Sequence, residues 1–105
     1  MDASLHALAD GTRRHILSLV WDKERPAGEI AAHFSLTRPA VSQHLSVLLE
    51  SDLVAVRQEG TRRLYHANRD RIEALRAELD AFWGGRMAKL KTAAERAQKE
   101  KRKRR

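Results

Sequence analysis

The sequence predicts a mostly α-helical domain with one small β-hairpin. Apolar residues recur at steps of three and four through most of the first 52 residues, then alternate with polar ones up to about residue 67, and afterwards return to helical spacing. A period near 3.6 is typical of a helix with one buried face, and a period of two is typical of a strand. The expected order is therefore four helices, two strands and one long final helix.

Three short helices are expected before residue 35. The first is too short to be stable alone and carries Leu5 and Leu8 on one side, so it needs a partner surface. Asp10 can cap the second by accepting a hydrogen bond from its first turn. The ranges are 3–9, 12–21 and 27–34, with a polar turn over residues 22–26.

A fourth helix, over residues 37–52, is the stretch around which the chain is organised. It has one apolar stripe, formed by Val41, Leu45, Leu48 and Leu49. Thr37 can cap its first turn, and a proline in that turn, Pro39, loses no internal hydrogen bond. We expect the stripe to face the core and the helix to begin abruptly at Thr37.

The opposite side of this helix carries short polar groups and one long cation, namely Arg38, Pro39, Ser42, Gln43 and Ser46. Such a surface lets a backbone approach base edges in a DNA major groove. Residues 27–34 and this helix, joined by a tight connection, form the helix-turn-helix pattern. An ordinary amphipathic surface helix is the alternative interpretation.

The hairpin follows directly, with strands over 53–56 and 63–67 and a glycine turn over 57–61. A hairpin in this position is a wing. Its tip offers Arg57, Arg62 and Arg63, which can pair with phosphates or enter a narrow minor groove. Because strand side chains alternate, Arg57 and Arg63 can instead lie along the hairpin and leave only Arg62 to reach a groove. A solvated charged loop is the other interpretation.

The final helix has an apolar seam that so small a domain cannot cover, formed by Ile72, Leu75, Leu79, Phe82, Trp83, Met87 and Leu90. We expect a second copy of the chain to cover it, with the first helix alongside. The predicted dimer interface comprises Leu5, Leu8, Leu79, Phe82, Trp83 and Met87. Adjacent glycines, Gly84 and Gly85, predict a kink or a local end of the helix.

The net charge of +7 is concentrated at the C-terminal end. Residues 96–105 contain seven Lys or Arg and one Glu, a net +6, which leaves +1 for residues 1–95. This composition provides no apolar face, so we expect a basic, disordered tail over 95–105 after one domain over 1–94. The total charge is weak evidence that the domain itself binds nucleic acid.

Several classes of function are excluded or disfavoured. The chain has no cysteine, which removes disulfides and thiolate metal sites. No two of its five histidines have an i, i+4 spacing that would present them to one metal ion, and we expect no cofactor. No nucleophile has a base and an acid at readable spacing, so an enzyme is not expected. The sequence shows neither a signal peptide nor an apolar span, so we expect a soluble cytoplasmic protein without membrane contact.

With these motifs in place, the chain resembles winged helix-turn-helix repressors of the ArsR type over about residues 4–92. The resembling residues are Leu8-Ala9-Asp10, Thr12-Arg13-Arg14, Ile16-Leu17, Glu29-Ile30-Ala31, Arg38 to Leu45 with Leu48, Leu53-Val54 and Gly60 to Tyr65. The resemblance implies a homodimer joined through its first and last helices. It also implies repression through an inverted repeat, with the two recognition helices about 34 Å apart on double-stranded promoter DNA.

By this resemblance, the DNA-binding residues are Thr37, Arg38, Pro39, Ser42, Gln43, His44, Arg57, Gly60, Arg62 and Arg63. For His44, packing inside the domain is the alternative to DNA contact. Metal-sensing members carry Cys-x-Cys in the helix matching residues 27–34, or Asp and His ligands along the last helix. This chain has neither, and the pair Phe82-Trp83 resembles members without a metal site, which respond to a partner protein or an unknown effector.

Two other functions are consistent with the sequence. A winged domain can serve as a protein-interaction module, although such proteins usually carry acidic or apolar replacements on the recognition face. A DNA-packaging protein could act through its basic tail, and it would bind any duplex with similar affinity, whereas a repressor favours its site by about 10³ or more.

Overall fold

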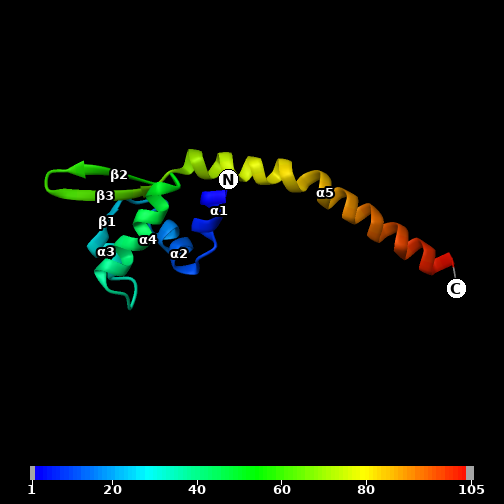
Figure 1. The fold of residues 1–105 in the computed structure, drawn as a ribbon, viewed down its shortest axis with the longest axis horizontal. Coiled ribbons are helices and arrows are strands. Elements are labelled where there is room, and N and C mark those ends of the chain that lie inside the picture. Colours follow the sequence, from blue (N-terminus) through cyan, green and yellow to red (C-terminus); the bar gives the residue numbers. More distant parts are fainter. Residues whose placement is uncertain (1, 104–105) are drawn as a thin grey trace. The chain divides into compact units, whose positions relative to one another are not determined.

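The structure, a computed structural model, describes the backbone of residues 2–103 and the side chains of residues 2–100. The chain divides into two compact units, one ending at Glu73 and one beginning at Ala74. The elements are α1 (Asp2–Leu8), α2 (Gly11–Leu19), β1 (Arg25–Pro26), α3 (Ala27–Ala31), α4 (Arg38–Glu50), β2 (Val54–Glu59), β3 (Arg62–Ala67) and α5 (Arg69–Lys103), as Figure 1 shows. Across the described range, no helix is long and apolar enough to span a membrane.

The predicted class, a mostly helical domain with a β-hairpin, is confirmed, but the sheet has a third strand. Strands β2 and β3 form the antiparallel hairpin, and β1 pairs with the outer edge of β3 through Arg25 opposite Tyr65 and Pro26 opposite Leu64. The expected polar turn over 22–26 is therefore wrong at its last two residues. Proline has no N–H to donate, and an edge strand is where a sheet tolerates it.

Helices α1 and α2 are joined by side chains at their facing ends. Asp10 caps α2 as predicted, accepting from the Arg13 N–H at 3.1 Å. Arg13 then donates to the carbonyls of His6 and Ala7, and Arg14 donates to that of Leu8. These bonds add partners to carbonyls at the end of α1, where the helix itself supplies few.

The side of α1 that faces the core carries small residues. Ser4 and Ala7 are buried, whereas Leu5 is 39% exposed and Leu8 is half-buried. Small residues face inward because they let α1 lie close to its neighbours, and Arg71 donates to the Ser4 hydroxyl at 3.3 Å. The apolar side chains of α1 are left for an outer contact.

The core of the first unit lies between the helices and the sheet. Its largest fully buried side chains are Ile16, Val20, Ile30, Val41, Leu45, Leu48 and Leu53. Helix α3 ends at Ala31, earlier than the predicted Phe34, and a turn over residues 32–37 leads into α4. The predicted apolar stripe of α4 is confirmed at three positions, and Leu49 is half-buried.

The hairpin is longer and its turn tighter than predicted. Helix α4 ends where Asp52 adopts a left-handed backbone with φ of 60°, a conformation that aspartate tolerates better than most residues. Strand β2 runs to Glu59 and β3 begins at Arg62, so that only Gly60 and Thr61 form the turn. Gly60 also has positive φ, 61°, and the turn therefore requires it or a residue like asparagine.

Helix α5 differs from the sequence expectation at its C-terminal end, where it remains helical to Lys103 instead of becoming irregular near Ala94. Of the two outcomes predicted at Gly84 and Gly85, a kink or a local end, the helix shows no local end. Residues 86–103 consist mainly of Ala, Lys, Arg, Glu and Gln, which are strong helix formers even without an apolar face to bury. The functional division into a domain over 1–94 and a tail over 95–105 stays a prediction.

The core position of Leu48 gives a test of this packing. Leu48 is fully buried, whereas Leu36 in the turn before α4 is 39% exposed. Replacing Leu48 by Ala should lower the free energy of unfolding by about 2–5 kcal/mol, because it leaves a cavity in the core. Leu36→Ala removes the same atoms and should cost much less. Similar urea midpoints for the two variants would contradict this core.

Candidate nucleic-acid interface

Helix α4 presents the polar face that the sequence predicts. The Thr37 hydroxyl accepts from the Ala40 N–H at 3.3 Å, and Pro39 lies in the first turn. Because Val41, Leu45 and Leu48 are buried, Ser42, Gln43 and Ser46 point to solvent. Arg38 and Pro39 are exposed at the helix start. The burial of the apolar side of α4 therefore determines which residues its exposed side presents.

The turn before α4 leaves room for the side chain of Arg38. Its guanidinium lies over Gly28 of α3, so that a Cβ built on this glycine would be 3.7–3.9 Å from the guanidinium atoms. The cation thus lies across the start of α3 and stays exposed.

The register of the hairpin separates the predicted wing arginines. Gln58 lies opposite Arg63, and Arg57 lies opposite Leu64. Directly paired residues share a face and neighbours along a strand alternate, so Arg63 and Tyr65 lie on one face while Arg57 and His66 lie on the other. The register thus places Arg57 and Arg63 on opposite faces, and the alternative in which only Arg62 reaches a groove stays a prediction.

A cleft joins the hairpin tip to the start of α4. It has a volume of about 350 Å³ and is lined by Pro26, Ala27, Arg38, Ser42, Thr61, Arg62, Arg63 and Tyr65. We call it the arginine cleft. With the described residues, the guanidinium groups of Arg38, Arg62 and Arg63 form no ion pair or hydrogen bond. Three cations with free donors in one concave surface are suited to phosphate oxygens.

Arg57 is engaged on the opposite side of the hairpin. Its Nε donates to the Glu24 carboxylate at 2.6 Å and its Nη2 to that of Glu59 at 3.1 Å. The hydrogen bond from Arg57 holds the pKa of Glu24 below its ordinary value, and the same bond raises the pKa of Arg57. This pair ties β2 to the segment before β1, a role that differs from the predicted DNA contact.

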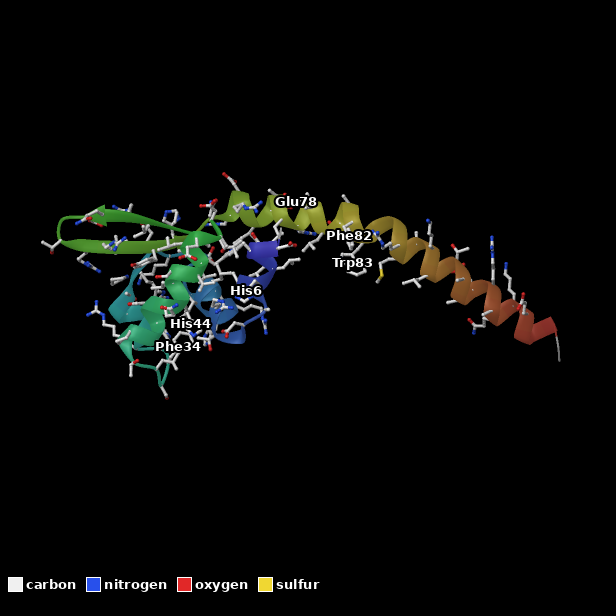
Figure 2. The ribbon with its side chains drawn as sticks, in the orientation of Figure 1. His6, Phe34, His44, Glu78, Phe82 and Trp83 are labelled. Carbon is white, nitrogen blue, oxygen red and sulfur yellow. The ribbon has the colours of Figure 1, made fainter. Side chains whose placement is uncertain are left out.

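His44 of α4 lies beside α2. Its Nδ1 is 3.4 Å from Nη1 of Arg13, and the residue is half-buried. Figure 2 shows His44 on α4 and His6 on the neighbouring α1. The backbone N–H of Arg13, with smaller contributions from the charges of Arg13 and His44, lowers the pKa of Asp10. This geometry favours the packing alternative for His44.

Two features of the site were missed from the sequence. Tyr65 is nearly buried yet lines the arginine cleft, and Arg13 is the neighbour of His44. The alternation of β3 could have placed Tyr65 on the same face as Arg63. Nothing in the sequence signals the pairing of Arg13 with His44, because the two residues are 31 positions apart.

The residues of the predicted dimer interface carry exposed apolar surface. Phe82 is 44% exposed, Trp83 49% and Met87 59%, while Leu79 is half-buried. The rings of Phe82 and Trp83 meet edge to face at 5.0 Å on α5 (Figure 2). With Leu90, 63% exposed, they form an apolar strip on the second unit.

Comparison with known proteins decides the family. The family model described as "Bacterial regulatory protein, arsR family" matches residues 10–56. The chain is 46% identical over 82 residues to the HTH-type transcriptional regulator Rv2034 of Mycobacterium tuberculosis, which covers 78% of this chain and 77% of that protein. The chain belongs to the ArsR family. It is a DNA-binding transcriptional regulator, and proteins of this family are not enzymes.

Solved structures of similar proteins agree with the fold. An ArsR-like transcriptional regulator from Rhodococcus sp. RHA1 has a TM-score of 0.75 and 28% identity, over 90% of this chain and 89% of that one. The homodimeric winged helix-turn-helix DNA-binding domain of Mb0332 from Mycobacterium bovis has a TM-score of 0.62 and 27% identity, over 79% and 82% of the two chains. The winged helix-turn-helix class is thereby confirmed.

The chain has no cysteine. Over the described part of the chain, no three His, Asp or Glu side chains gather in a way that could hold a metal ion.

The ion pair of Arg57 with Glu24 predicts a pH-dependent stability. The pKa of Glu24 in the folded state lies below its ordinary value of 4.5. Its contribution to stability is therefore present above about pH 4.5 and lost as the pH falls through the lowered pKa. Glu24→Gln should have a lower urea midpoint than the parent near neutral pH, and this deficit should become smaller as the pH falls from 4.5 to about 3.

Glu50→Gln is the matched control, since Glu50 is exposed and forms no ion pair with the described residues. It should change little at either pH. A Glu24→Gln deficit that is the same at both pH values would show that the ion pair does not stabilise the fold.

Proposed function

We propose that this protein is a homodimeric repressor that binds an inverted repeat in promoter DNA. One recognition helix α4 of each copy enters the major groove, and the hairpin β2–β3 lies against the backbone or the minor groove. The observation that carries the proposal is the arginine cleft, because it places Arg38 of the recognition helix beside Arg62 and Arg63 of the wing. Bound near a promoter, the dimer would exclude the transcription machinery.

The exposed face of α4 supports a division of labour among its residues. Gln43 is long enough to read a base edge, and an amide can bond adenine in a bidentate way. Thr37 and Ser42 are short and lie near the helix start, where they donate to phosphates. Arg38 contacts guanine or a phosphate. Pro39 and Gly60 bring the backbone close to the duplex without adding a donor.

The three wing arginines contribute unequally in this proposal. Arg62 and Arg63 line the arginine cleft with no carboxylate attached among the described residues, so they pair with the DNA backbone. Arg57 would have to leave Glu24 and Glu59 to reach DNA, and it therefore contributes least. His44 contacts DNA only if it leaves Arg13, which makes it a secondary candidate.

The exposed apolar residues support the homodimer. Leu5 on α1 is exposed, and Phe82, Trp83, Met87 and Leu90 form an exposed apolar strip on α5, the kind of surface that often marks an interaction site. A second copy covers such surface symmetrically, and the related domain of Mb0332 is homodimeric. Leu8 and Leu79, both half-buried, complete the proposed interface. An effector or a partner protein that relieves repression would act on this dimer.

The role of Gln43 can be tested by its effect on sequence preference. Gln43→Ala removes one base-edge contact, so it should weaken binding to the operator by about 1–3 kcal/mol and leave binding to a scrambled duplex nearly unchanged. Fluorescence anisotropy on both duplexes measures the two affinities. Ser46→Ala, on the same exposed face, is the control and should keep the preference. Equal losses on both duplexes would refute the base contact.

The proposed interface can be tested with one charge on each side of α5. Trp83→Glu places a carboxylate within the apolar strip and should raise the dimer dissociation constant by about 30-fold or more, the loss typical of an aromatic hot spot. Ala81→Glu adds the same charge outside the strip and should leave the dimer intact. Sedimentation equilibrium reports both. A parent protein that is monomeric at micromolar concentration would overturn the homodimer.

A further inference from the structure

We propose that the end of α5, from Ala88 onward, is a second DNA-contacting element, which binds duplex phosphates through cations on one face of the helix. The inference rests on the proposed DNA-binding function and extends it beyond the helix-turn-helix and the wing. Lys89, Arg96 and Lys99 form this basic face.

The continuity of α5 places the three cations together. Since the helix is unbroken to Lys103, positions 89, 96 and 99 are spaced at i, i+7 and i+10 and lie on one side. Trp83, Met87 and Leu90 of the apolar strip lie about a third of a turn or more away around the helix, whereas Phe82 is on the side of Lys89 but about two turns before it. A copy bound through Trp83, Met87 and Leu90 would therefore leave the basic face open from Lys89 onward.

Small side chains separate the cations. Ala88, Thr92 and Ala93, together with Lys89 and Arg96, line a shallow depression of about 370 Å³. The Thr92 hydroxyl donates to the Ala88 carbonyl at 3.0 Å and does not project outward. No bulky group between the two cations would prevent a phosphate backbone from approaching the helix.

The charges on this face are free to bind an anion. Lys89, Arg96 and Lys99 form no ion pair with any residue that the structure describes. Residues 96–105 carry a net +6, so the local field strongly favours a polyanion. A duplex supplies regularly spaced phosphates, and the release of its counterions drives such binding.

The sequence favours DNA over an anionic membrane as the partner. A helix that lies on a bilayer buries Trp, Phe or Leu beside its cations. Residues 91–105 contain no large apolar residue, and their only uncharged side chains are those of Ala, Thr and Gln. A purely polar basic helix matches the backbone of a duplex better than the boundary of a bilayer.

The experiment compares two doubly substituted full-length proteins that lose the same charge and the same residue types. Lys89→Gln with Arg96→Gln removes the basic face, and Lys91→Gln with Arg102→Gln removes one Lys and one Arg at positions on another side of α5. Anisotropy titrations use operator and scrambled duplexes over a range of salt concentrations. Each duplex carries about 15 base pairs on either side of the operator or the scrambled sequence. This length is chosen because about 30 residues of helix span about 45 Å, so the end of α5 could contact DNA beyond the operator.

The Lys89→Gln/Arg96→Gln protein should have a shallower slope of log affinity against log salt concentration than the parent. The magnitude of the slope should fall by about two to four, because two cations are lost on one chain or on both chains of a dimer. The affinity of this protein near 0.1 M salt should fall at least tenfold on both duplexes, with the operator preference unchanged. The second pair should keep most of the parent slope. If the parent protein itself showed no preference for the operator over the scrambled duplex, the proposed repressor function would be refuted.

Three results would overturn the inference. An unchanged slope in the first pair would show that the basic face makes no phosphate contact. Equal decreases of the slope in the two doubly substituted proteins would show that total charge matters and that its position on one face of α5 does not. The parent could also bind vesicles of anionic lipid more tightly than the scrambled duplex. If the Lys89→Gln/Arg96→Gln protein lost this binding, the basic face would be assigned to a membrane.

Discussion

The burial of one side of α4 is the constraint on which the recognition surface depends. Val41 and Leu48 are completely buried and Leu45 is 1% exposed, so the helix cannot rotate without exposing a core side chain. This fixed orientation directs Ser42 and Gln43 to solvent, and the Thr37 cap fixes where the exposed face begins. Each apolar side chain is worth roughly 1.5–3 kcal/mol when buried, which exceeds any preference of the polar face. Packing energy therefore sets the geometry with which DNA is read.

The hairpin adds a second surface to the first through the alternation of its strands. Arg63 and Tyr65 face the start of α4, whereas Arg57 faces Glu24, so a single strand pair serves both binding and anchoring. An anchored wing keeps its arginines near Arg38 before DNA arrives, which reduces the ordering cost of binding. This chain thus combines a recognition helix held by the core with a hairpin held by an ion pair.

The sequence predicted the features that depend on neighbouring residues. The caps by Asp10 and Thr37 and the stripe of α4 depend on spacings of three to eight residues, and all were recovered. Strand β1, the Arg57–Glu24 pair and the Arg13–His44 contact join distant segments, and no local pattern signals them. The persistence of α5 to Lys103 differs from the prediction because residues such as Ala, Lys, Arg, Glu and Gln favour a helix even without an apolar face to bury. The roles of the candidate DNA-binding residues stay predictions.

The most direct test of the account is the preference of the parent protein for one DNA sequence. Anisotropy titrations would compare the duplex upstream of its own gene with a scrambled duplex of equal length at two salt concentrations. A dimeric repressor that reads bases through α4 should favour the native duplex by about 10³ or more at both concentrations. Equal affinities that fall steeply with salt would contradict it and assign binding to the basic end of the chain alone, and no binding to either duplex would indicate a protein partner.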